Sequence, residues 1–174
     1  HYPLRRQRQM CIRDSFKPGG SGTFQFDKTI LEKNKETIKE ILRSPKKDTF
    51  VLEGGHVLDK LYCQARANLG KYKQERMNLL TAYNDPLFDQ LQKNSVFVIF
   101  NLPPGVSLSR QEGRGKSEFN TPELEILQFV HKNLLEFYMG NKENTIFINL
   151  MGKTEEDVYE ELKTKLLAMI EEPK

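Results

Sequence analysis

Three cations stand among glycines in the stretch SRQEGRGK, where their charge is suited to holding phosphate. They are Arg110, Arg114 and Lys116. On a helical turn, Arg110 and Arg114 would project to the same side. Guanidinium groups match pairs of phosphate oxygens, and their charge offsets the charge that spreads over a phosphoryl group during transfer. The stretch is therefore a candidate for binding phosphate, although on spacing alone a solvated loop with ordinary surface cations is the favoured interpretation.

Glu53 is a second candidate, because it comes directly after the apolar run Thr49–Leu52. A carboxylate at the carboxyl end of a buried strand can orient a hydroxyl, accept a proton or hold a magnesium ion. The alternative is that Glu53 only begins a turn shaped by Gly54 and Gly55. His56 comes next and is more typical of the start of a helix than of a catalytic base.

A glycine-rich loop, FKPGGSGTF, covers residues Phe16–Phe24. Such loops expose backbone N–H groups to anions. The loop is not a P-loop, since the pattern G-x-x-x-x-G-K-[ST] is absent and no lysine stands within the loop after its glycines. A flexible surface loop is the alternative interpretation.

Helices and strands alternate along the chain that must position these residues. Apolar residues at helical spacing predict helices, and short β-branched or aromatic runs predict strands. Proline breaks the fourth predicted segment near residues 84–86, and Thr121 and Thr154 are expected helix caps. The predicted order is helix 27–44, strand 49–52, helix 56–70, interrupted helix 73–92, strand 95–102, helix 120–140, strand 144–150 and helix 153–172.

The run SVFVIFNL at residues 95–102 has no polar alternation, which indicates a strand buried on both faces. Together with the helix–strand rhythm, it predicts an α/β fold: a three-layer parallel sheet with helices on both faces. Ligands bind at the carboxyl ends of strands in such sheets. The loops after Leu52, Leu102 and Leu150 are therefore the expected site.

Length and composition are those of one globular domain. The chain has 174 residues and a formal net charge of +3, which is too mild to indicate a nucleic-acid partner by itself. No apolar run approaches the roughly 20 residues that span a bilayer. Cys11 and Cys63 have neither metal-site nor disulfide spacing, so we expect free thiols, no metal bound by protein ligands and a reducing, cytoplasmic setting.

Residues 1–15, HYPLRRQRQMCIRDS, differ from the rest of the chain: they are rich in arginine and have no periodicity. They resemble translated adapter sequence, so we expect a non-native or disordered segment. A basic arm or a targeting peptide is the alternative. The domain itself is expected over residues 16–174, with a lid near residues 107–120.

The order of these features resembles the thymidylate kinases and related deoxynucleoside kinases of the P-loop nucleotide kinase superfamily. The resemblance covers residues 16–171 and is carried by PGGS, by a strand ending in an acid, by LYCQARANLG and by LPPGVSLSRQEGRGK. The last of these matches the strand, the double proline and the Arg-x-x-x-Arg-Gly-Arg lid of that family, with Lys116 as a conservative change. The sequence departs from the family in lacking the P-loop and its strand. A further departure is Gly54, which stands where an arginine is expected after the acid.

The resemblance implies a role for each matching residue. The lid cations Arg110, Arg114 and Lys116 would close over the phosphates of ATP and of the acceptor, with Glu53 as the site acid. The acceptor nucleotide would lie near Gln64 and the glycine-rich loop, that is, near Pro18, Gly19 and Gly20.

The implied reaction is phosphoryl transfer from ATP, with Mg²⁺, to a deoxynucleoside monophosphate, dTMP above all. Without a P-loop, we expect little activity from the chain as given. The resemblance also implies nucleotide partners and a homodimer, with no membrane or nucleic-acid partner. A non-catalytic binding or assembly module of the same fold is the alternative, and a nucleic-acid-binding module that uses residues 110–116 is a weaker one.

Overall fold

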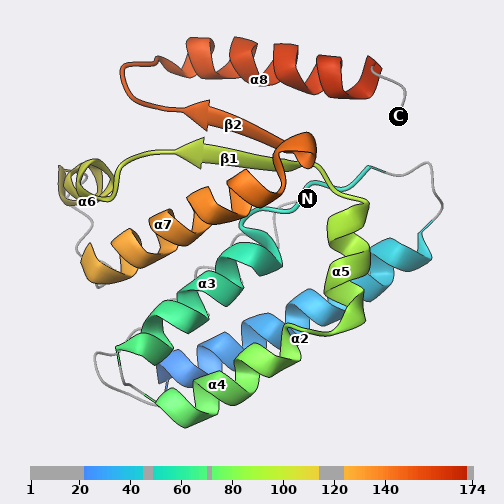
Figure 1. Ribbon diagram of the computed structural model, residues 1–174, viewed down its shortest axis with the longest axis vertical. Helices are drawn as coiled ribbons and strands as arrows, with labels where there is room; N and C mark the ends of the chain where they lie inside the picture. The colour runs from blue at the N-terminus through green and yellow to red at the C-terminus, as the bar shows by residue number, and fades with distance from the viewer. Residues whose placement is uncertain (1–21, 45–48, 70–71, 114–123, 172–174) are drawn as a thin grey trace.

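The computed structural model describes residues 22–44, 49–69, 72–113 and 124–171 (Figure 1). Most of these residues are helical, and two short strands form the only sheet among them. The elements are α2 (Gly22–Arg43), α3 (Gly55–Asn68), α4 (Lys73–Ala82), α5 (Pro86–Lys93), β1 (Phe97–Asn101), α6 (Pro104–Gly113), α7 (Leu124–Gly140), the 3-10 helix η1 (Lys142–Asn144), β2 (Thr145–Asn149) and α8 (Glu155–Glu171).

The two strands run parallel, in a register that pairs Phe97 with Thr145 and Asn101 with Asn149. Helix α7 packs on one face of this pair through aromatic contacts. The ring of Phe97 meets that of Phe137 edge-on with centroids 5.0 Å apart, and Phe147 stacks on a tyrosine of α7. The connection from β1 to β2 runs through α6 and α7, as parallel pairing requires.

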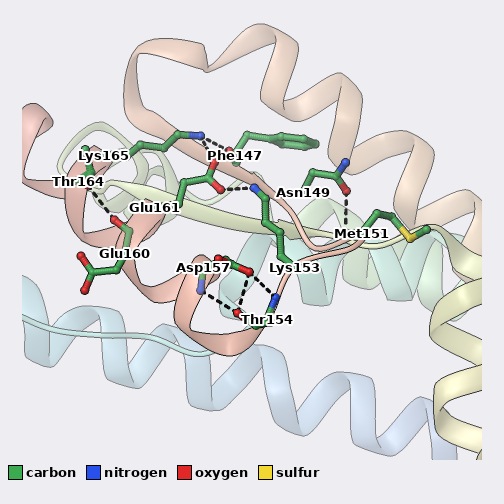
Figure 2. A network of polar contacts seen from close by, with 10 residues as sticks. All are labelled: Phe147, Asn149, Met151, Lys153, Thr154, Asp157, Glu160, Glu161, Thr164 and Lys165. Atoms are coloured by element: carbon green, nitrogen blue, oxygen red, sulfur yellow. Dashed lines mark hydrogen bonds and ion pairs between the residues drawn. The ribbon is translucent and has the colours of Figure 1, made fainter.

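Helix α8 runs beside β2, on the side away from β1 (Figure 1). A reciprocal cap begins the helix, as the sequence predicts for Thr154. The Asp157 amide donates to Thr154 Oγ1 at 3.2 Å, and the Thr154 amide donates to Asp157 Oδ2 at 2.8 Å (Figure 2). This satisfies backbone donors that an uncapped helix would leave without partners.

Helices α2 to α5 form a separate layer below the strands (Figure 1). Their side chains bury one another, and α3 joins the layer to α7. Asp85 caps α5 by accepting from the Leu87 amide at 3.1 Å, and Pro86 opens that helix. The core of the layer consists of Leu31, Ile38, Tyr83, Phe88 and Leu91.

The expected three-layer sheet is wrong. In the described residues the sheet has two strands, and the apolar faces of α2 and α5 pack against helices rather than against a sheet. Residues 49–52 are not a strand, and Phe50, Val51 and Leu52 are exposed. Short apolar runs become strands only where a neighbouring strand takes up their backbone groups.

Other predictions are confirmed. Strands form within residues 95–102 and 144–150, and they pair in parallel. The break between α4 and α5 falls at the predicted proline. Helix α2 begins earlier than predicted, at Gly22, so the end of the predicted glycine-rich loop is helical. The expected segment 1–15 and the Thr121 cap lie outside the described residues.

Candidate functional site

Two asparagines end the parallel strands side by side. Asn101 and Asn149 are register partners, and the Leu150 amide donates to the Asn101 carbonyl at 2.9 Å. Both side chains therefore leave the sheet at its carboxyl edge, where ligands of parallel sheets bind. Amides offer both donors and acceptors there, without a charge of their own.

His131, on α7, fixes one of these amides. Its Nε2 lies 2.8 Å from Asn101 Oδ1, and the ring is half-buried. An amide oxygen only accepts, so Nε2 is the donor in this contact. The bond holds Asn101 in one orientation and leaves its Nδ2 group to donate to a ligand.

The turn after β2 is held by its own polar contacts. The Met151 amide donates to Asn149 Oδ1 at 3.2 Å, and Gly152 adopts a positive φ of 72°. Lys153 comes next and pairs with Glu161 of α8 (Figure 2). The pKa of Glu161 lies below its ordinary value because its carboxylate accepts hydrogen bonds, mainly from Lys153 and secondly from Lys165. Much of the Lys153 charge is thus already neutralised.

The turn after β1 leads directly into α6. The sequence predicts a loop after Leu102, where this helix lies. Pro103 accepts from the amides of Val106 and Ser107, both at 3.0 Å, and so starts the helix. Arg110 lies in the last turn of α6 and is exposed. The helix stands beyond the carboxyl end of β1 (Figure 1). Arg110, which belongs to the predicted lid near residues 107–120, therefore lies on a helix.

The remaining predicted residues divide between two places. Glu53 is exposed before the first turn of α3, and Gln64 is half-buried within that helix. The first turn of α3 and helix α6 stand apart in Figure 1, and both helices pack against α7. Pro18, Gly19, Gly20, Arg114 and Lys116 lie outside the described residues.

Gly54, which separates Glu53 from α3, has φ 79° and ψ −55°. This conformation is strained for any residue with a side chain. A Cβ there would meet only ordinary contact, 3.9 Å from Leu58 Cδ2, so the restriction comes from the backbone. The position expected to hold an arginine is therefore built for glycine.

Comparison with protein-family models, curated proteins and solved structures found no match. Within the described ranges, no helix is long and apolar enough to span a membrane. The same ranges contain no group of three or more histidine, cysteine or acidic side chains that could hold a metal ion. The carboxyl edge offers neutral amides instead, which do not fit a magnesium site.

Sequence reasoning missed two polar clusters. One is Asn101 with His131, because the helical pattern around His131 predicts only a surface or half-buried residue with no site role. The other is the buried carboxylate Asp27, which pairs with Arg66 and accepts from Arg76 Nε at 3.0 Å. Asp27 shares a helix face with Leu31 and Ile38, and an acid on an apolar stripe is the signal that could have found it.

Cys63 lies beside this second cluster and donates to the Arg76 carbonyl. Burial, and to a smaller extent the nearby Asp27 charge, raises the pKa of the thiol to about 11. The thiol therefore stays protonated at neutral pH and is a poor nucleophile. The cluster therefore offers no reactive group, and the carboxyl edge of the strands is the better candidate site.

Proposed function

We propose that this chain binds a deoxynucleoside phosphate, dTMP above all, at the carboxyl edge of β1 and β2, as a nucleotide-kinase-like protein. The proposal rests on one observation: His131 orients the Asn101 amide at the strand end that leads into α6. Asn101 Nδ2 would donate to an oxygen of the nucleotide. Arg110 would pair with a phosphate oxygen from the next helix.

Catalysis at such a site would consist of positioning and charge neutralisation, without a covalent intermediate. The described residues offer no magnesium site, so no step through the metal is assigned to them. The γ-phosphoryl donor, ATP, would rely on the cations of the predicted lid, Arg110, Arg114 and Lys116.

A non-catalytic nucleotide-binding or assembly module is the second candidate, and Gly54 favours it. The strained backbone there excludes the arginine that a kinase of this type is expected to carry after Glu53. A chain that lost the cation and adapted its backbone would keep binding without turnover.

Calorimetric titration with dTMP, and separately with ATP, tests binding. The protein should bind dTMP, and Arg110→Ala should weaken that binding about tenfold or more, the loss of one charge-assisted contact. Arg43→Ala is the matched control, since Arg43 is an exposed cation in the last turn of α2. It should leave the affinity unchanged.

A coupled assay for ADP release with dTMP separates the two candidates. Turnover would support the kinase, and binding without turnover would support the module. Absence of binding to dTMP, ATP and inorganic phosphate would overturn both.

A further inference from the structure

Among the described residues, strand β1 is paired along one edge. The hydrogen bond from Leu150 N to Asn101 O sets the phase of the ladder. Backbone groups alternate sides along a strand, so Phe97, Ile99 and Asn101 direct theirs toward β2. Val98 and Phe100 direct their N–H and C=O groups the other way. In the part of the chain that the structure describes, no strand lies on that side.

Strand β2 has no comparable open edge. Helix α8 runs along it, and Lys165 Nζ donates to the outward-facing Phe147 carbonyl at 2.8 Å (Figure 2). A lysine placed in this way is a common means of protecting an edge strand. Of the two strands that the structure describes, β1 is therefore the one with an edge available for pairing.

The β1 edge is also apolar and carries no charge. Val98 is 39% exposed and Phe100 is 50% exposed. No charged residue occurs in the sequence from Asn94 to Ser109. Edge strands usually carry a charge that repels other edges, and this one does not. The absence of charge removes any electrostatic guide for a charged partner, and it also removes the repulsion between two identical edges.

We propose that β1 pairs antiparallel with β1 of a second copy of this chain, about a two-fold axis at Ile99. In that register Val98 faces Phe100 of the other copy, and Phe100 faces its Val98. These are the residues whose backbone groups point outward, so each facing pair exchanges two hydrogen bonds. The result is one continuous sheet of four strands, β2–β1–β1–β2.

Two features make a second copy the occupant. A two-fold interface must be self-complementary, and the alternation around Ile99 satisfies this in both hydrogen bonds and side chains. The facing pairs are β-branched against aromatic, a combination that stabilises antiparallel strands. One strand pair buries less than a standard interface, so the dimer forms in the micromolar to millimolar range.

Sedimentation equilibrium from about 1 μM to about 1 mM protein tests the association. The wild-type chain should pass from monomer to dimer, and Val98→Lys should raise the dissociation constant at least about tenfold. The matched control is Val51→Lys, which adds the same charge at an apolar residue that is 93% exposed and lies outside the strands. It should dimerise like the wild type.

The register has its own test. Val98→Glu and Phe100→Lys should each weaken self-association, whereas an equimolar mixture should form a heterodimer, because the new charges would face each other directly. Amide exchange in the wild type gives a readout that does not depend on any variant: protection at Val98 and Phe100 should grow with protein concentration.

A monomer throughout the concentration range, or exchange at these two amides that ignores concentration, would overturn the proposal. The proposal would also be overturned if Val98→Lys left the dimer intact or if Val51→Lys disrupted it. Either result would place the interface elsewhere. Circular dichroism confirms that each variant is folded before it is scored.

Discussion

Two regions of the molecule differ in what they bury and what they expose. The helical region consists of residues 22–44 and 55–93, and the sheet region of residues 97–113 and 124–171. In the helical region a carboxylate and an arginine are buried, since Arg76 is 1% exposed and pairs with Asp27. In the sheet region apolar side chains remain in solvent, Phe100 among them. Among the described residues, the helical region encloses paired charges, and the sheet region leaves a strand edge without a neighbouring strand.

This difference distinguishes the part of the molecule that buries paired charges from the part on which both proposals rest. Buried charges are tolerated in the helical region because three helices bring their partners together: α2 supplies Asp27, α3 supplies Arg66 and α4 supplies Arg76. In the described residues no buried side-chain polar atom lacks a partner. The sheet region holds the amide–imidazole pair and the edge of β1 that lacks a neighbouring strand in the described residues, which are the features that the two proposals use.

The comparison is tested most strongly at Arg76. Arg76→Met leaves Asp27 buried with one partner fewer, and it should lower the free energy of unfolding by about 3–5 kcal/mol, measured by urea denaturation. Arg43→Met removes an exposed cation and should change the same free energy by less than about 0.5 kcal/mol. Equal effects of the two substitutions would show that the buried cluster does not hold the helical region together.

Matched phenylalanines sharpen the contrast between the regions. Phe88 is 2% exposed within the helical core, whereas Phe100 is 50% exposed on β1. Phe88→Ala should cost about 3–5 kcal/mol of unfolding free energy, and Phe100→Ala less than about 1 kcal/mol at monomeric concentrations. A large loss at Phe100 in the monomer would mean that the sheet region has a tighter core than the exposed fraction indicates.

His56 gives the smallest of the three effects, through pH. Burial first, and then the charge of Lys60, lowers its pKa from 6.5 to about 4, with Asp89 opposing the shift. The unfolded chain therefore binds a proton that the folded chain does not between those two values. The contribution of His56 to stability is complete above pH 6.5 and declines as the pH falls toward 4.

Urea denaturation at pH 7 and pH 4.5 should differ by about 1–2 kcal/mol from this residue. The imidazole of His56 stacks on Phe88 with ring centroids 5.0 Å apart. His56→Phe keeps a ring in this position and should remove most of that difference. Three carboxylates have a lowered pKa, namely Asp85, Asp157 and Glu161. Their contribution to the free energy of unfolding is lost at a lower pH than that of His56, so the two effects can be distinguished. An unchanged pH dependence in His56→Phe would contradict the assignment.

Local patterns in the sequence determined several elements without help from the fold. The Thr154 cap, the proline break before α5 and the two β-branched runs depend on neighbouring residues, so they are readable in order along the chain. The sequence also predicts a site at the carboxyl edge of the strands. The side chains that meet there, Asn101 and His131, are 30 residues apart, and no local pattern connects them.

Only the tertiary structure decided which apolar runs became strands and which charges were buried. Residues 49–52 have the composition of a strand but no neighbour that takes up their backbone groups, so the expected three-layer sheet did not form. Asp27 meets Arg66 and Arg76 across 39 and 49 residues. Pairing and burial depend on what else is near in space, and a one-dimensional pattern does not contain those distances.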